Sequence, residues 1–174
     1  MEQKKEIPIR VVAKYTVLRL QQLGASISPL KLQKILYYIQ AWHMVYFDHD
    51  SLFSAQPEAW VNGPAYREIY DEYKSIGIYD QITPEFFDLT FESVTGEVEK
   101  LHSEMALQQN QWDFLEAIYK HYGMMGHDRL VMLTHSEKPW NEARKGLSPI
   151  EYSDNKISLE SMYDYYKGLL EKQV

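Results

Sequence analysis

Residues 28–46 form the segment whose pattern leaves the fewest choices for the fold. Ser28 can cap a helix, Pro29 suits the first helical position, and Ile27 can pack against Leu32 in a hydrophobic staple. Beyond that start, apolar and aromatic side chains cover one broad face and extend around it until little polar surface remains. Because such a helix has to be enclosed by other elements, the sequence predicts a mainly helical fold built around it.

Other segments carry the end signals and the apolar spacing of three and four residues that are typical of helices. With 174 residues and 45% hydrophobic composition, the chain suits one compact domain. We therefore expect a mainly α, single domain over residues 1–174, with six or seven helices and a loose tail at residues 1–6. The further helices are expected at residues 8–23, 64–75, 128–134 and 158–172, from about Trp112 to Gly123, and from Pro139.

A minor β element is predicted near residues 51–61, where two short extended pieces, 51–54 and 58–61, flank a turn. A second strand is one reading of residues 87–94, because apolar and polar side chains alternate there. Residues 94–106 score equally well as a polar helix. Both readings stay open at this point.

The overall charge and the cysteine count exclude several classes of protein. The formal net charge is -7, which repels a phosphate backbone and disfavours nucleic acid as a partner. The absence of cysteine excludes disulfides, thiolate metal sites, iron–sulfur clusters and a cysteine nucleophile. No apolar run approaches the roughly 18 residues of a membrane span, and the charged N-terminus has no apolar stretch behind it. We expect a cytoplasmic protein that makes no contact with a membrane.

The charges are distributed unevenly along the chain. Residues 48–104 hold 13 acidic and three basic side chains, which makes them either a docking face for a basic partner or a solvated surface. Residues 1–34 hold seven basic and two acidic side chains. This basic third leaves a DNA-binding autorepressor as an alternative function. Its contacts would come from Lys4, Lys5, Arg10, Lys14 and Arg19.

The search for catalytic motifs finds no nucleotide-binding loop, nucleophile elbow, zinc-protease motif or calcium-binding loop. The six histidines never fall three or four residues apart, the spacing that brings two imidazoles to one metal on a helix. Folding can still bring His43 to Asp50, or His121 to His127. We expect no enzymatic activity, no cofactor and no metal. A small metal-dependent hydrolase using His43, His135 and nearby carboxylates remains the alternative from another class.

Bulky residues gather at two expected corners of the chain. At residues 60–64, Gly63 can adopt a positive φ and Pro64 suits the start of a helix, so the corner is fixed in shape. At residues 134–140, a threonine and a histidine can bond to helix ends and Trp140 supplies a large apolar plug. Both corners are interpreted as locks between helices or as parts of a binding surface.

Arg144 lies one helical turn beyond Trp140, so its guanidinium can stack on the indole or clamp a carboxylate. Fourteen tyrosines and four tryptophans offer stiff contact area at a low entropic cost of ordering. Those that are exposed are candidates for an interface. We select Tyr66, Tyr70, Tyr79, Tyr163 and Tyr166.

Several of these residues stand in an order that is found in a known family. The relevant motifs are Leu32-Gln33-Lys34-Ile35-Leu36-Tyr37-Tyr38, Gln40-Ala41-Trp42-His43, Glu58-Ala59-Trp60, Gly63-Pro64, Leu133-Thr134-His135, Pro139-Trp140 and Ala143-Arg144. Together they resemble the Panacea domain, a phage-associated group that includes the SocA-like antitoxins. The resemblance is strongest over residues 29–146.

The resemblance implies a mainly helical antitoxin of a toxin–antitoxin system in bacteria or prophages. Such an antitoxin neutralises a cognate protein toxin, encoded by a neighbouring gene, through direct protein–protein interaction. At least one branch of the family instead delivers the toxin to a cytosolic protease as an adaptor, which is the alternative role. The family-motif positions, with structural or partner-binding roles, are Leu32, Lys34, Tyr37, Trp42, Trp60, Gly63, Pro64, Thr134, His135, Pro139, Trp140 and Arg144.

Overall fold

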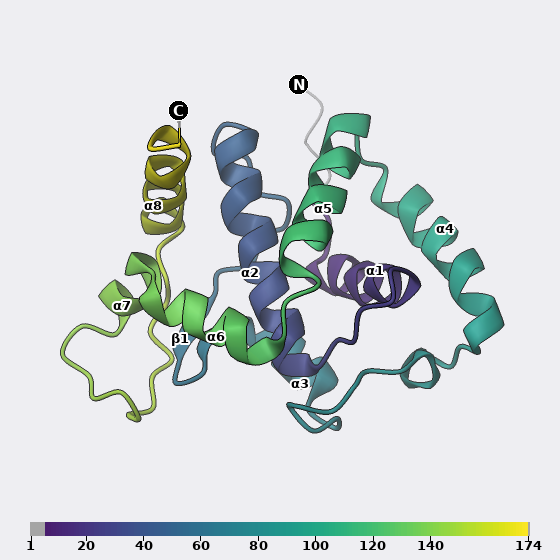
Figure 1. The fold of residues 1–174 in the computed structure, drawn as a ribbon, viewed down its shortest axis with the longest axis horizontal. Coiled ribbons are helices and arrows are strands. Elements are labelled where there is room, and N and C mark those ends of the chain that lie inside the picture. The colour runs from purple at the N-terminus through teal and green to yellow at the C-terminus, as the bar shows by residue number, and fades with distance from the viewer. Residues whose placement is uncertain (1–5, 174) are drawn as a thin grey trace.

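Helix α2 (Pro29–Tyr46) runs through the middle of the molecule in a computed structural model that describes residues 6–173. Helix α8 (Leu159–Glu171) lies on one side of it and α5 (Gln109–Tyr122) on another (Figure 1). The Ser28 hydroxyl accepts a hydrogen bond from the backbone N–H of Lys31 at 3.2 Å, which caps α2 as its sequence predicts. Because 14 of the 18 residues of α2 are buried, this helix is the axis of the hydrophobic core.

The other helices are arranged around this axis (Figure 1). Helix α1 packs against α2, and α4 packs against α1, so α4 forms an outer layer. Helix α6 contacts α2, and α7 contacts α8. Within residues 6–173 there are eight α-helices and one small sheet, which confirms the predicted mainly α fold. The number of helices is one above the six or seven expected, because residues 94–105 form a helix where the sequence left two readings open. The remaining helices are α1 (Ile9–Gln22), α3 (Arg67–Tyr73), α4 (Val94–Met105), α6 (His127–Ser136) and α7 (Lys138–Ala143).

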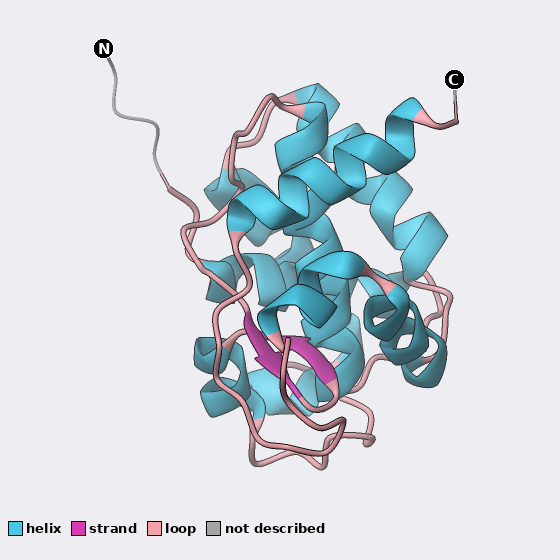
Figure 2. Ribbon diagram, turned by 90° about the vertical axis from the view of Figure 1, so that its left-hand side faces the viewer, coloured by secondary structure: helices cyan, strands magenta, loops and turns pink. Residues whose placement is uncertain are grey.

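The sheet is a short antiparallel hairpin, magenta in Figure 2. Strand β1 (Glu58–Trp60) pairs with β2 (Gly63–Ala65), with Glu58 opposite Ala65 and Trp60 opposite Gly63. Strand β2 also contacts α2 and α6. The hairpin therefore connects the central helix to the second half of the chain.

The prediction that residues 51–54 are extended is wrong, because this segment forms bends and no strand. The reason lies in Gln40 of α2. Its side-chain amide accepts a hydrogen bond from the backbone N–H of Leu52 at 3.0 Å and donates one to the carbonyl of Phe53 at 2.6 Å. One side chain thus satisfies backbone groups that a strand partner would otherwise satisfy.

The prediction that a helix opens at Pro64 is also wrong. Pro64 belongs to β2, opposite Ala59, and α3 begins at Arg67. A proline has no backbone N–H to donate, but in a two-stranded sheet it can take a place without breaking an interior ladder. Proline before an apolar run fits a helix start and an edge strand equally well in the sequence.

Residues 87–94 do not form the second strand. Short 3₁₀ turns occupy Pro84–Phe87 and Phe91–Ser93, and Asp88 between them has a φ of 56°. The alternating apolar and polar side chains therefore lie in and between two turns and not on a strand. The alternative interpretation, a polar helix from residue 94, is confirmed by α4.

Within the described residues 6–173, no helix is both long enough and apolar enough to cross a membrane.

Candidate functional site

Eight of the twelve family-motif positions converge where the hairpin meets α2, α6 and the end of α7. We call this group the motif cluster. It combines one residue of α2, the hairpin residues and side chains from the chain after residue 130. Its members are Lys34, Trp60, Gly63, Pro64, Thr134, His135, Trp140 and Arg144.

The centre of the motif cluster is a close approach between α2, β2 and α6. The Lys34 ammonium donates a hydrogen bond to the carbonyl of Pro64 at 3.0 Å. Gly63 has a φ of 100°, and a Cβ at this position would lie 2.7 Å from Lys34 Cε and 2.8 Å from Thr134 Oγ1. Only glycine fits this position without strain or displacement of its neighbours.

Lys34 is a buried cation, with 1% of its surface exposed. Burial lowers the pKa of the Lys34 ammonium from 10.5 to about 7, because removing it from water disfavours the charged form. No acidic side chain in the described part of the chain contributes to this shift. Lys34 therefore changes its charge near neutral pH.

Trp140 and Arg144 fasten α7 to the hairpin. The Trp140 indole N–H donates to the carbonyl of Trp60 at 2.8 Å, and Arg144 Nη1 donates to the carbonyl of Ala59 at 2.9 Å. The guanidinium lies over the Trp140 ring, 5.2 Å from its centroid, as the spacing predicts. Arg144 Nη2 also donates to the carbonyls of Ser148 and Glu151, so among the described residues Arg144 bonds to backbone carbonyls and not to a carboxylate.

His135 lies against the same corner. Its imidazole stacks on Trp140, with 4.1 Å between the ring centroids and 16° between the planes. Burial and the positive charge of Lys34 lower the pKa of His135, against a hydrogen bond to the backbone of Val61 that raises it. Among the described residues, its Nε2 atom is buried without a hydrogen-bond partner.

The other four motif positions are buried or half-buried packing residues. Leu32 and Tyr37 belong to the hydrophobic core, and Pro139 is buried in the first turn of α7. Tyr37 contacts Tyr166 of α8, and the Trp42 indole N–H donates to the Tyr122 hydroxyl at 2.8 Å. Tyr37 and Trp42 thus hold α2 against α8 and α5.

Glu58 is a central residue of the hairpin that the sequence analysis did not select as a site residue. It accepts hydrogen bonds from Trp60 Nε1 at 2.6 Å, Arg67 Nη2 at 2.8 Å and Lys156 Nζ at 3.0 Å. Burial alone would raise the pKa of this carboxyl, but these three donors outweigh it and lower the pKa to about 2. The available signal was a single acidic residue in an otherwise apolar extended segment.

An aromatic patch extends outward from the motif cluster. The ring centroids of Trp60 and Tyr70 lie 5.0 Å apart, and the Arg67 guanidinium lies 5.1 Å from the Trp60 ring centroid. Arg67 also reaches the Tyr152 hydroxyl at 3.4 Å. Tyr70 is 40% and Tyr152 71% exposed. We use the term aromatic patch for these four residues, Trp60, Arg67, Tyr70 and Tyr152.

The tyrosines selected from the sequence fall into two groups. Tyr70 and Tyr79 are exposed and remain available for an interface. Tyr66, Tyr163 and Tyr166 are buried and contribute to the core. Tyr152 is more exposed than Tyr70 and Tyr79, and it was not among the residues selected from the sequence.

The two histidines of the hydrolase alternative have different surroundings. His43 stacks on Phe47 at 4.4 Å, and its Nδ1 bonds to the backbone carbonyl of Asp50 at 2.7 Å. Among residues 6–173, no group of three or more His, Asp or Glu side chains is placed to hold a metal ion.

The basic stripe of the autorepressor alternative is engaged in ion pairs. Arg10 pairs with Glu68 at 2.8 Å, Lys14 with Glu97 at 2.7 Å, and Arg19 with Glu116 at 2.8 Å. These cations join α1 to α3, α4 and α5. Lys4 and Lys5 lie outside the described residues.

Comparison with protein families places residues 32–141, more than half of the chain, in the family described as antitoxin SocA-like, Panacea domain. No curated protein and no solved structure matched the chain. The matched range includes the hairpin, α6 and Trp140, and thus all of the motif cluster except Arg144. It lies within the range over which the motifs resemble the family. The chain therefore belongs to the family of SocA-like antitoxins with a Panacea domain.

Proposed function

We propose that this protein neutralises a cognate protein toxin, encoded by a neighbouring gene, by binding it directly and occluding its active surface. Family membership supports the antitoxin role and, in general terms, a protein toxin as the partner. No residue of the chain forms or breaks a bond in this proposal. The action is binding alone.

The aromatic patch is the surface that we propose for binding the toxin. Tryptophan, tyrosine and arginine are the residue types that contribute most to binding energy at protein interfaces. Here Trp60, Arg67, Tyr70 and Tyr152 contact one another on one face, and Glu58 holds Arg67 in place. Their contacts with one another restrict these side chains, which lowers the entropic cost of ordering an interface.

The patch rests on the motif cluster, because the Trp60 carbonyl accepts the Trp140 indole N–H. Motif residues that are themselves buried would thus act by fixing the hairpin that presents the patch. A complete interface of the standard size of roughly 1,600 Å² would extend beyond these four residues onto neighbouring surface.

The test is co-expression with the product of the neighbouring gene. Growth should be arrested by that gene alone and rescued by this protein, and the two proteins should co-purify. Tyr70→Ala and Tyr152→Ala should each weaken binding, and the double substitution should abolish rescue, with a loss of at least about 2 kcal/mol of binding free energy. A harmless neighbouring gene product, or a pair that does not co-purify, contradicts the proposal.

Tyr46→Ala is the matched control. Tyr46 is an exposed tyrosine, 57% accessible, at the C-terminal end of α2 and outside the aromatic patch. This variant should rescue growth like the native protein. If Tyr46→Ala abolishes rescue while the double substitution in the patch does not, the binding surface is misplaced.

The steady-state amount of the toxin separates occlusion from proteolytic delivery. Occlusion predicts that the toxin persists in cells at full length, bound and inactive. If its amount falls only when this protein and an intact cytosolic protease are both present, the protein acts as an adaptor and occlusion is wrong.

A further inference from the structure

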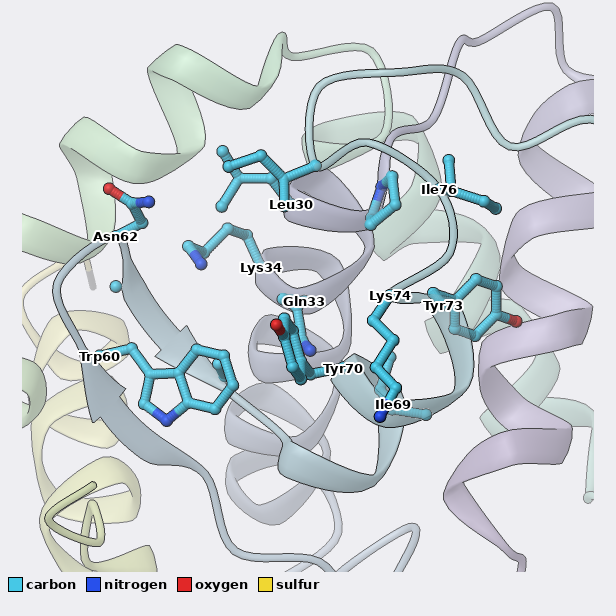
Figure 3. A pocket seen from close by; sticks show the side chains of 14 residues that line it. Leu30, Gln33, Lys34, Trp60, Asn62, Ile69, Tyr70, Tyr73, Lys74 and Ile76 are labelled. Carbon is cyan, nitrogen blue, oxygen red and sulfur yellow. The ribbon is translucent and has the colours of Figure 1, made fainter. Parts of the chain in front are cut away.

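A cavity of about 220 Å³ lies between α2, the hairpin and α3, behind the aromatic patch (Figure 3). Its walls are mostly apolar and aromatic. The Lys34 side chain extends from α2 between Trp60 and Asn62, and Tyr70 lies close by (Figure 3). The apolar walls are formed chiefly by Leu30, Trp60, Ile69, Tyr70, Ile76 and Ile78.

The charges around this cavity all have one sign. Lys34 and Lys74 are its two charged lining residues in the part of the chain that the structure describes, and none of the lining residues is acidic. This is unexpected in a protein with 25 acidic side chains and a net charge of -7. Lys74 is exposed and pairs with Asp71 at 3.4 Å. Lys34 is the buried member of the pair.

Lys34 is under-used as a hydrogen-bond donor. An ammonium has three N–H groups, and among the described residues that of Lys34 donates to the carbonyl of Pro64. Lys31, a buried lysine one turn earlier in α2, donates to two carbonyls, those of Ser26 and Gly123. Burying a cation without a counter-charge is unfavourable, and an anion brought by a ligand would relieve that cost.

We propose that this cavity binds a monocarboxylate with one aromatic or branched apolar group, the carboxylate meeting Lys34 and the apolar group packing against Trp60 and Tyr70. An apolar wall with a few convergent polar groups is the usual construction of a small-molecule site. A cavity of about 150 Å³ holds benzene, so the volume here accommodates one ring with a short carboxylate arm. A free metabolite and the C-terminal residue of a polypeptide both present this chemistry.

The probe is 3-phenylpropionate, titrated into the purified protein and followed by calorimetry and tryptophan fluorescence. The expected result is saturable binding with one site per chain. 3-Phenylpropionamide has the same shape without the charge, and it should bind at least about tenfold more weakly. Equal affinity for the amide, or no binding of the carboxylate, overturns the proposal.

Lys34→Met tests the role of the ammonium. It should weaken binding of 3-phenylpropionate at least about tenfold. Lys31→Met is the matched control, because Lys31 is a buried lysine of the same helix that does not line the cavity, and it should retain native affinity. Thermal melts establish that both variants are folded. Native affinity in Lys34→Met contradicts the proposal.

Ile78→Trp provides a second test that leaves the core unchanged. Ile78 lines the cavity and is 40% exposed, so a larger side chain there should obstruct entry without affecting folding. Binding should be lost. Unchanged binding in this variant places the site elsewhere and overturns the assignment.

A tetrapeptide that ends in phenylalanine separates the two sources of the ligand. The cavity recognises the end of a polypeptide if the peptide with a free C-terminus binds more tightly than 3-phenylpropionate and the amidated peptide does not bind more tightly than 3-phenylpropionate. If the free compound binds and neither peptide does, the ligand is a small carboxylate. Both results support the proposal, and neither depends on the identity of the toxin.

Discussion

The packing of the motif cluster depends on the absence of a Cβ at Gly63. A Cβ here would meet Lys34 Cε at 2.7 Å and Thr134 Oγ1 at 2.8 Å, at a φ of 100°. Gly63→Ala should therefore lower the free energy of unfolding by about 2–4 kcal/mol, the sum of backbone strain and overpacking. Urea denaturation measures this loss.

Gly96→Ala is the control for Gly63→Ala. Gly96 lies within α4, and nothing lies within 4 Å of a Cβ placed there. Alanine in a helix interior should raise stability by about 0.5–1 kcal/mol. If the two substitutions have equal effects, the close approach at Gly63 carries no strain.

Lys34 should make the stability of the protein depend on pH near neutrality. Its folded pKa is about 7, against 10.5 for an unburied lysine. Between these values the unfolded chain binds more protons than the folded one, so the free energy of unfolding rises with pH. The slope approaches about 1.4 kcal/mol per pH unit between pH 7.5 and 9. Chemical denaturation at several pH values measures it.

Lys34→Met should lack this contribution to the slope, because methionine does not titrate. Lys138→Met, at an exposed position, should keep the native slope. Equal slopes in Lys34→Met and the native protein would mean that folding does not lower the pKa of Lys34.

At the scale of elements, Glu58 joins the hairpin to two other parts of the chain. It binds Arg67 at the start of α3 and Lys156 in the segment before α8. Its pKa falls from 4.5 to about 2 on folding, so its contribution is present above pH 4.5 and lost as the pH falls toward 2. We expect a contribution on the order of 2 kcal/mol, reduced by water around the half-exposed Arg67 and Lys156.

Glu58→Gln should lower the free energy of unfolding at pH 7 and show a smaller loss between pH 5 and pH 2.5 than the native protein. Glu104→Gln, on the exposed side of α4, serves as the comparison and should behave as the native protein does. Denaturation curves across this pH range decide the matter. If Glu58→Gln loses as much unfolding free energy between pH 5 and pH 2.5 as the native protein does, Glu58 does not link the hairpin to α3 and the C-terminal segment.

Local signals predicted the elements where the chain carries its own end markers. Ser28 was expected as a helix cap, and its side chain accepts a hydrogen bond from the backbone N–H three residues on. Residues 51–54 were mispredicted because their backbone partners come from Gln40, a side chain of another element. A side chain that forms hydrogen bonds to the backbone of another element leaves no periodic pattern in the sequence from which these bonds could be predicted.

The candidate site was predictable only in part for the same reason. The corners at Trp60, Gly63 and Trp140 were expected from bulky residues beside glycine and proline. The partnership of Glu58 with Lys156, 98 residues away, has no local signature. The cavity and the aromatic patch are likewise products of tertiary packing.

At the scale of the whole molecule, α8 completes the enclosure of α2. Met162 and Tyr166 are buried, and the Tyr166 ring lies 5.3 Å from that of Trp42. Removal of residues 158–174 should expose these apolar surfaces of α2 and abolish cooperative folding. Circular dichroism melts and sedimentation test this expectation.

A shorter truncation, of residues 172–174, leaves α8 complete and should melt as the native chain does. If the chain without residues 158–174 retains a sharp thermal transition, the first seven helices fold independently and α8 is an accessory.

The enclosure of α2 also determines how the protein unfolds and how it is degraded. Backbone amides of a covered helix exchange with deuterium only when the surrounding helices separate, so α2 should show the slowest exchange, at the rate of global opening. Exchange read by mass spectrometry tests this, and rapid exchange in α2 would contradict it. A protease that has to cleave within α2 could then act only when the entire fold opens, which is rare. Substitutions that weaken the packing of any covering helix would make this opening more frequent and shorten the lifetime of the antitoxin in the cell.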